Sequence, residues 1–309
     1  MPGLKREARL RAGVPGIHVL GFVKQEDVDG RDKPGHDEEK FSMNRLAVII
    51  AMMGLLTTPA NASDPVLLHA AGSLRGALTE VSQAFEISSA LKVQAKFGAS
   101  GLLRDEISGG AKAEVFASAN MEHPQALAKA GKSGPVVLFA RNKLCALVRP
   151  GLGLTPDTLL DRMLDLQIKL GTSTPKADPS GDYAFEAFRK AETVRPNSRS
   201  VLQNKALQLT GGATSTAPPA GRNAYGWHLA EGRADIFLAY CTAARDAQKE
   251  NPGLQMIALP DALAVSADYG LTVMTGASTG AYRLALFILS SEGQRILASY
   301  GFSAPSLSE

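Results

Sequence analysis

The sequence predicts an α/β protein with two lobes, each a mostly parallel sheet flanked by helices, joined by two hinge crossovers. Strand and helix signals alternate along most of the chain, as in parallel sheets that helices cover on both faces. The segment 133–149 holds two strand-like pieces with no helix between them, which suits a crossover between lobes. Asp268–Met274 supplies the return strand. These crossovers predict a first lobe of 64–140 plus 272–309 and a second lobe of 141–271.

The first 62 residues are expected to lie outside the fold. Residues 1–42 mix Gly, Pro and charges of both signs without any period, and we interpret them as a disordered extension that arises from a misplaced gene start at Met1. Residues 43–62 then have the pattern of a cleavable signal peptide, with Met43-Asn44-Arg45, an apolar run and Ala60-Asn61-Ala62. The alternatives are a buried helix or an uncleaved anchor. We therefore expect translation from Met43, export to the periplasm and a mature chain that begins near Ser63.

The composition of the remaining chain narrows the class of protein. About 245 residues suffice for one large domain or two small ones. The whole chain is 45% hydrophobic with a net charge of +3, and no basic tract or aromatic platform suggests a nucleic-acid partner. Export permits disulfides, and Cys145 and Cys241 either pair or remain two buried thiols.

In the first lobe, short apolar runs bounded by turn residues predict strands at Pro65–Ala70, Lys92–Phe97 and Glu114–Ser118. Helical periodicity predicts helices at Leu74–Phe85, Leu102–Ile107, Glu122–Ala130, Ala281–Ser290 and Glu292–Ser299.

In the second lobe, the same signals predict strands at Lys143–Val148, Gln167–Gly171, Asp235–Tyr240 and Leu254–Leu259. The expected helices are Pro156–Met163, Tyr183–Ala191, Val201–Leu209 and Tyr225–Glu231. The loop 211–221 is rich in Gly, Thr, Ser and Pro, and is expected on the surface or at the mouth of a cleft.

Three serines lie at turns that lead from a strand into a helix. Ser73, Ser100 and Ser180 each precede a helical stretch, next to a glycine. A serine there can cap the helix, and the same geometry offers N–H donors and the positive end of the helix dipole to an anion. Ligands of parallel sheets bind at the carboxyl ends of the strands, where all three turns lie. The pattern predicts a small anion held by hydroxyls and amides, although ordinary capping is compatible with it.

Several segments match a known family in their order and spacing. They are 70–74 (AAGSL), 97–103 (FGASGLL), 110–119 (GAKAEVFASA), 179–184 (PSGDYA), the strand 234–240 and the closing Tyr300-Gly301-Phe302. Over nearly all of 64–304 the chain resembles the periplasmic molybdate-binding proteins of bacterial ABC importers. The resemblance implies a periplasmic-binding-protein fold of type II that closes over molybdate or tungstate. It also implies a monomer without a cofactor, which delivers the anion to an inner-membrane permease and its ATPase.

The resemblance assigns ligand roles to residues of this chain. It implies that the hydroxyls of Ser73, Ser100 and Tyr240, and the backbone N–H of Ser180, bind the anion. The remaining backbone ligand is expected near Arg222, where an arginine after Pro218-Pro219 departs from the family pattern. Arg222 is either a further ligand or a solvated charge on the rim.

The sequence leaves two other functions to consider, a different ligand and catalysis. The same fold could bind sulfate, phosphate, a phosphonate or a small carboxylate. A hydrolase would require a triad such as Ser73 with His69 and Asp178, but the sequence has no G-x-S-x-G elbow, so no catalytic residue is expected. Neither the five histidines nor the two cysteines have metal-ligand spacing, and molybdate is expected to bind as an oxyanion.

Overall fold

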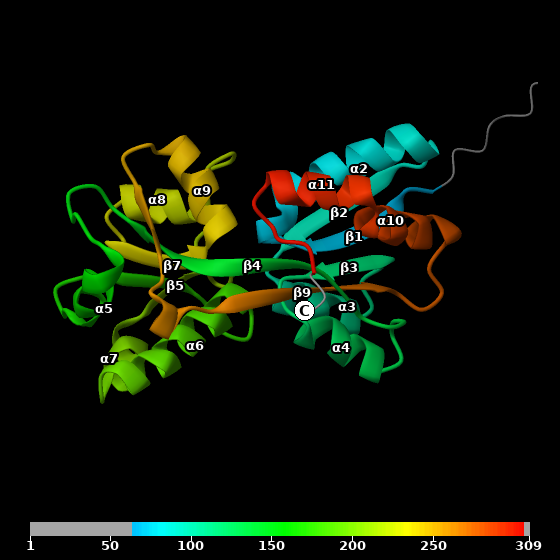
Figure 1. Ribbon diagram of the computed structural model, residues 1–309. Coiled ribbons are helices and arrows are strands. Elements are labelled where there is room, and N and C mark those ends of the chain that lie inside the picture. Colours follow the sequence, from blue (N-terminus) through cyan, green and yellow to red (C-terminus); the bar gives the residue numbers. More distant parts are fainter. Residues whose placement is uncertain (1–63, 306–309) are drawn as a thin grey trace, which may run out of the picture. The chain divides into compact units, whose positions relative to one another are not determined.

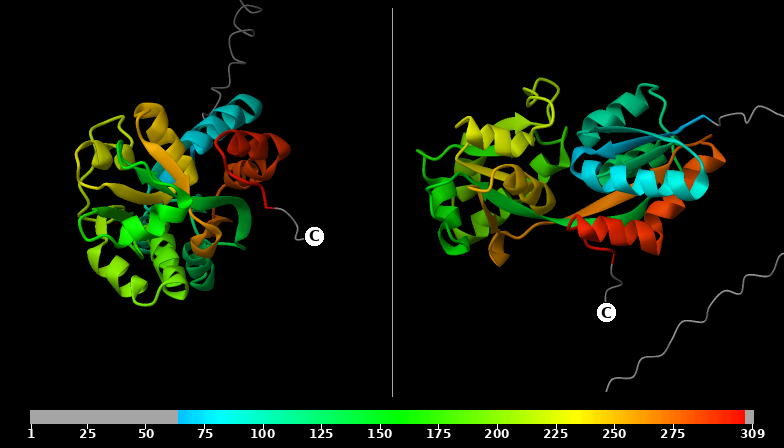
Figure 2. Two further views of the ribbon diagram at one scale, coloured as in Figure 1. Left: turned by 60° about the vertical axis from the view of Figure 1, so that its left-hand side comes forward. Right: turned by 90° about the horizontal axis from the view of Figure 1, so that it is seen from above.

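Two long strands belong to both halves of the fold. The computed structural model describes residues 64–305, so the expected extension at 1–42 and signal peptide at 43–62 lie outside the described residues. Strand β4 (Val137–Val148) pairs antiparallel with β9 (Ser266–Val273) along its first half and with β7 and β8 along its second half. In Figures 1 and 2, β4 and β9 run from one group of helices to the other. The predicted crossovers are therefore confirmed, and they join one sheet to the next.

The first lobe contains three parallel strands in the order β2 (Val93–Gly98), β1 (Val66–Ala71) and β3 (Val115–Ser118), with β9 antiparallel beside β3. The short 3-10 helix η1 (Gly72–Leu74) leads from β1 into the helices of this lobe, which are α2 (Arg75–Ser89), α3 (Ser100–Ser108), α4 (Glu122–Lys129), α10 (Thr279–Leu289) and α11 (Ser291–Ser299). In Figure 1, α2, α10 and α11 lie on one side of this sheet and α3 and α4 on the other.

The second lobe places β5 (Leu170–Ser173) between β6 (Leu207–Thr210) and β7 (Ile236–Tyr240), all parallel, with β4 antiparallel to β7. Strand β8 (Gln255–Ala258) pairs with the far side of β4. The helices are α5 (Pro156–Leu164), α6 (Pro179–Val194), α7 (Ser198–Lys205), α8 (Ala224–Ala230) and α9 (Cys241–Glu250), with the 3-10 helix η2 (Asp261–Leu263) before β9.

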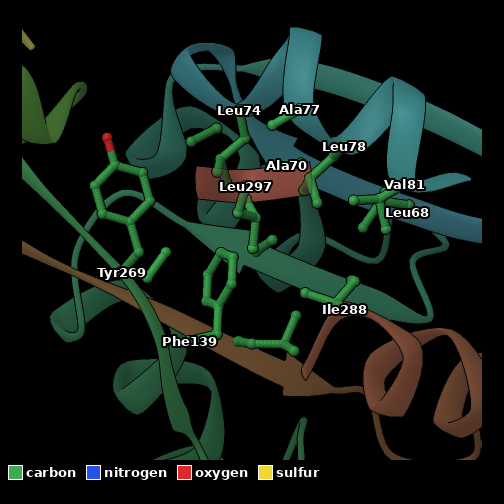
Figure 3. Close-up of a cluster of buried hydrophobic side chains, with 14 of the residues drawn as sticks. Leu68, Ala70, Leu74, Ala77, Leu78, Val81, Phe139, Tyr269, Ile288 and Leu297 are labelled. Atoms are coloured by element: carbon green, nitrogen blue, oxygen red, sulfur yellow. The ribbon is translucent and has the colours of Figure 1, made fainter. Parts of the chain in front are cut away.

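Side chains along each strand point alternately to the two faces of the sheet, which explains why helices cover both faces. In β3, Val115 and Ala117 join the core beneath α2 and α10, whereas Phe116 between them packs with residues of α3 and α4. Successive side chains of a strand point to opposite faces, so a run of apolar residues needs helices on both sides. Figure 3 shows the larger core of the first lobe, with Tyr269 of β9 at its edge and the tyrosine hydroxyl directed away from Phe139.

The second lobe shows the same alternation. Ala146 of β4 and Leu238 of β7 belong to the core beneath α5, α6 and α7. Their neighbours Leu147 and Phe237 face α8 and α9 on the opposite side. The two lobes therefore have separate cores, and the predicted α/β class with mostly parallel sheets is confirmed. The boundaries at 140/141 and 271/272 fall inside β4 and β9 and stay a prediction.

Three predictions about elements were wrong or incomplete. The helix expected at Val201–Leu209 ends at Lys205, and residues 207–210 form strand β6 because they pair with β5. The strand-like pieces at 136–139 and 143–148 form the single strand β4. Helix α9 was not predicted, because its buried face consists of small residues, mainly alanines, and its other residues are mostly charged or polar, so that its mean hydropathy is low. No helix among residues 64–305 is long and apolar enough to cross a membrane.

The two cysteines form a disulfide. Cys145 in the second half of β4 pairs with Cys241, the first residue of α9, with a separation of 96 positions in the sequence. The bond ties the strand shared by both lobes to the helix that directly follows Tyr240. Of the two alternatives that the sequence left open, the structure has the disulfide.

We predict that replacing both cysteines by alanine lowers the free energy of unfolding by about 2–5 kcal/mol, because a closed loop of this length constrains the unfolded chain. Urea unfolding of the oxidised protein, the reduced protein and the double variant measures this. Reduction should destabilise the wild type and leave the variant unchanged. Equal midpoints for all three samples would contradict the prediction.

Candidate functional site

A pocket of about 1200 Å³ lies between the two lobes. The first lobe contributes the turn after β1 and the start of α3, and the second contributes the start of α6 and the ends of β6 and β7. Of the five residues that the sequence singled out, the pocket lining includes Ser73, Ser100, Tyr240 and Arg222 but not Ser180. The carboxyl ends of strands from both sheets therefore meet at one pocket, as expected for parallel sheets.

Ser73 lies in the turn η1, and its hydroxyl is close to that of Tyr269 in the crossover strand β9. Its hydroxyl is 3.0 Å from the hydroxyl of Tyr269, which is buried in β9 and also accepts a hydrogen bond of 3.3 Å from the Asn142 amide. Burial raises the pKa of Tyr269, so the phenol keeps its proton. When Tyr269 donates that proton to Ser73, the Ser73 proton is free for a ligand in the pocket.

Ser100 is the first residue of α3 and is buried. Its hydroxyl oxygen accepts a hydrogen bond of 3.1 Å from the backbone N–H of Ala119, which follows β3. Because the Ala119 amide occupies a lone pair of the oxygen, it fixes the side chain and leaves the hydroxyl proton available as a donor. Ser73 and Ser100 are thus placed as two neutral donors on the same wall.

Tyr240 ends β7 and reaches across to the first lobe. Its ring packs against Tyr183 and Tyr269, with centroids 6.1 Å and 5.6 Å away, and burial raises its pKa well above the usual value. Its hydroxyl donates a hydrogen bond of 3.3 Å to the carbonyl of Ala119. In this structure the Tyr240 proton therefore goes to the backbone, and a ligand role for it stays a prediction.

Ser180 is fully buried in the first turn of α6. Its backbone N–H, the expected ligand group, donates a hydrogen bond of 3.1 Å to Oδ1 of Asp178. Its hydroxyl makes no hydrogen bond with the described residues. The N-terminus of α6 is therefore occupied by an acidic side chain of the chain itself, and the role implied for Ser180 stays a prediction.

Asp178 lines the pocket, although the sequence did not predict it as a ligand-binding residue. It caps α6 and also lines the pocket. Desolvation raises the pKa of its carboxyl, and hydrogen bonds from the Ser180 N–H and the Ser173 hydroxyl only partly oppose this. The sequence signal was an aspartate directly before Pro179, which is the usual pattern of an N-cap followed by proline at the first helical position.

Arg222 lies on the pocket wall near its mouth. Its guanidinium pairs with Glu250, which also accepts a hydrogen bond of 2.6 Å from the backbone N–H of Asn223. Partial burial raises the pKa of Glu250, but the contacts with Asn223 and Arg222 outweigh this and bring it below the usual value. The charge of Arg222 is therefore balanced by a carboxylate.

The two lobes touch through backbone groups beside the pocket. The N–H of Gly101 donates a hydrogen bond of 2.8 Å to the carbonyl of Ala177 in the other lobe. A side chain at position 101 would collide with the carbonyls of Lys176 and Ala177. Position 101 therefore requires glycine, because the backbones of the two lobes approach closely there.

The histidines His69 and His228 lie apart from the pocket and do not form a metal site. His69 is buried in β1 and His228 in α8, where its ring packs against Trp227 and Phe237. Within residues 64–305, no group of three or more His, Cys, Asp and Glu side chains could hold a metal ion. The expectation that the histidines belong to the core agrees with these positions.

The chain is similar in sequence to a known family and to one curated protein. Residues 66–303 match the model of a family described as bacterial extracellular solute-binding protein. Uncharacterized protein PM1146 of Pasteurella multocida (strain Pm70) is 34% identical over 235 residues, which are 75% of this chain and 96% of that protein.

Solved structures show the same fold at low sequence identity. The periplasmic molybdate-binding protein of Azotobacter vinelandii has a TM-score of 0.63 and 19% identity, covering 78% of this chain and 100% of that one. The sulfate-binding protein SubI of Mycobacterium tuberculosis H37Rv has a TM-score of 0.64 and 20% identity, covering 78% and 87%.

We predict that Gly101→Ala holds the lobes apart, because the added methyl group meets two carbonyls of the other lobe. Small-angle X-ray scattering with and without molybdate should show a larger radius of gyration than for the wild type under the same conditions. Gly109→Ala is the matched control, since its added carbon meets only carbonyls of its own helix at 3.4 Å. Identical scattering from all three proteins would argue against a close lobe contact in solution.

Proposed function

The chain belongs to the bacterial extracellular solute-binding proteins, and we propose that it captures a small oxyanion, molybdate or tungstate, between its lobes. The proposal includes delivery of the anion to an inner-membrane ABC permease with its ATPase. It also includes export to the periplasm by the signal peptide at 43–62. The observation that carries the proposal is the pair of neutral hydroxyl donors, Ser73 and Ser100, on one wall of a pocket between two lobes.

Neutral donors suit an oxyanion that has to be released again. Hydroxyl groups hydrogen-bond the oxygens of a dianion without a formal positive charge, and each bond to a charged acceptor contributes about 1.5–3 kcal/mol. The family binds solutes, so we propose that the pocket has no catalytic group and needs no cofactor. Arg222, already paired with Glu250, is proposed as a rim residue that assists attraction of the anion more than its retention.

A second candidate is a different small anion in the same pocket, such as phosphate, a phosphonate, sulfate or a small carboxylate. Asp178 favours the members of this class that carry a proton, because a carboxylate in the pocket can accept a hydrogen bond from a hydroxyl of the ligand. Molybdate, tungstate and sulfate are fully deprotonated near neutral pH and offer no such donor.

We predict that Ser73→Ala and Ser100→Ala each weaken binding of the preferred anion by tenfold to a hundredfold, because each removes one hydroxyl donor to a charged acceptor. Isothermal titration with molybdate, tungstate, sulfate and phosphate measures the affinities of wild type and variants. An anion that binds only the native state also raises its stability, by about 2.7 kcal/mol at a hundredfold excess over Kd.

Ser82→Ala is the matched control, because the Ser82 hydroxyl bonds a carbonyl of its own helix α2 and does not line the pocket. It should bind like the wild type. An anion that binds tightly to the wild type and equally well to both pocket variants would place the site elsewhere. An absence of binding and of any melting shift with all four anions would overturn the proposed function.

A further inference from the structure

The positive end of α6 is already neutralised by a side chain. Asp178 precedes Pro179 and accepts a hydrogen bond of 3.1 Å from the N–H of Ser180, so its carboxylate takes the place that an external anion would occupy. The helix is 16 residues long, and its N-terminus points to the pocket between the lobes. A ligand there meets a carboxyl group where the sequence led us to expect N–H donors.

The carboxyl group is fixed in position. A side-chain carbon on Gly211 would lie 2.5 Å from Oδ2 of Asp178, so the backbone of this residue abuts the carboxyl group. Gly211 has a φ of 75°, in the left-handed region that glycine adopts without strain. The Asp178 side chain therefore has no room to move towards Gly211, which also lines the pocket.

Apart from the Ser180 N–H, the groups that face Asp178 carry no positive charge. They are the hydroxyls of Ser173 on β5, Tyr225 on α8 and Tyr240 on β7, together with the carboxylate of Asp182 on its own helix. Burial raises the pKa values of both tyrosines, which therefore stay neutral.

Neither arginine of the pocket lining is paired with Asp178. Arg222 pairs with Glu250, and the guanidinium of Arg75 lies 4.9 Å from the centre of the Phe97 ring. The acidic residues Glu80 and Asp246 also line the pocket, towards its mouth. A dianion held next to Asp178 would therefore meet an ionised carboxyl group that no cationic side chain of the lining neutralises.

We infer that the pocket binds its oxyanion together with one proton, which is shared between the carboxyl group of Asp178 and an oxygen of the anion. This inference rests on the proposed function, since it names how the same pocket selects its anion. The raised pKa of Asp178, caused mainly by desolvation, agrees with it.

The proton can come from two sources, and these distinguish two classes of ligand. Hydrogen phosphate, a phosphonate or a phosphate monoester brings its own proton near neutral pH or donates one from a hydroxyl. Molybdate and sulfate bring none, so that their binding takes a proton from solution. At neutral pH the pocket therefore favours oxyanions that carry a hydroxyl, and molybdate binds well only as the pH falls.

The test is isothermal titration of the full mature chain at pH 6, 7 and 8 with molybdate, sulfate and phosphate, in two buffers of different ionisation enthalpy. The difference between buffers counts the protons taken up. We expect nearly one proton per molybdate or sulfate and a Kd that rises up to tenfold per pH unit. We expect no net proton uptake for phosphate at pH 8, where it is already present as the hydrogen phosphate dianion.

Asp178→Asn is the decisive variant, because asparagine caps a helix about as well as aspartate and should preserve the fold. Its carbonyl can accept the Ser180 N–H while its amide donates to the ligand. We expect proton uptake with molybdate to disappear, its Kd at pH 8 to fall at least tenfold, and the Kd of phosphate to rise at least tenfold. Far-ultraviolet circular dichroism and the melting temperature verify that the variant is folded.

Glu186→Gln is the matched control, since it removes a carboxylate from the same helix that pairs with Arg189 and does not line the pocket. It should keep the proton count and the order of affinities. Molybdate binding without proton uptake in the wild type, or identical behaviour of Asp178→Asn and Glu186→Gln, would overturn the inference and leave the proposed function intact. Failure of every anion to bind the wild type would overturn both.

Discussion

The structure depends on one constraint, namely that β4 is hydrogen-bonded to strands of two different sheets. Its first half pairs with β9 and its second half with β7 and β8, so both lobes are built on the same strand. The carboxyl ends of β1 and β7 consequently face one another across a pocket. The disulfide from Cys145 fixes α9 to the same strand, directly after Tyr240. Residues of both lobes can therefore act on one ligand only because the two crossovers keep the sheets adjacent.

Two neutral hydroxyls and the carboxyl group of Asp178 are the polar groups on which the proposed choice of anion depends. Ser73 and Ser100 line the pocket from the first lobe, and Asp178 lines it from the second. Two like unit charges about 5 Å apart repel by about 3 kcal/mol near a protein surface. If Asp178 stayed ionised, this repulsion would cancel much of the binding free energy that a fully deprotonated oxyanion gains from the two hydroxyl donors. A proton on Asp178 or on the ligand converts that repulsion into a hydrogen bond, which is why the protonation state and the choice of anion are linked.

Much of the fold could be predicted because its signals are local. Apolar runs such as 66–71 and 236–240, followed by helix-starting residues, define strands and helices without knowledge of their partners. Strand β6 could not be separated from the preceding helix, because only pairing with β5 distinguishes Leu207-Gln208-Leu209 from a helical turn. Helix α9 was missed because alanines bury a face without raising hydrophobicity. For the site, the positions of Ser73 and Ser100 followed from strand ends. The hydrogen bond from the Ser180 N–H to Asp178 could not be predicted, because the same sequence pattern is found at a capped helix and at a helix that binds an anion.

The position of the bound anion tests the account most directly. Crystals grown with tungstate, and separately with arsenate as a heavy analogue of phosphate, would locate each anion by anomalous scattering. The account predicts a single peak between the lobes, within hydrogen-bonding distance of the Ser73 and Ser100 hydroxyls and next to the Asp178 carboxyl group. A peak outside this pocket, or one coordinated by Arg222 at the rim without contact to either serine, would contradict it.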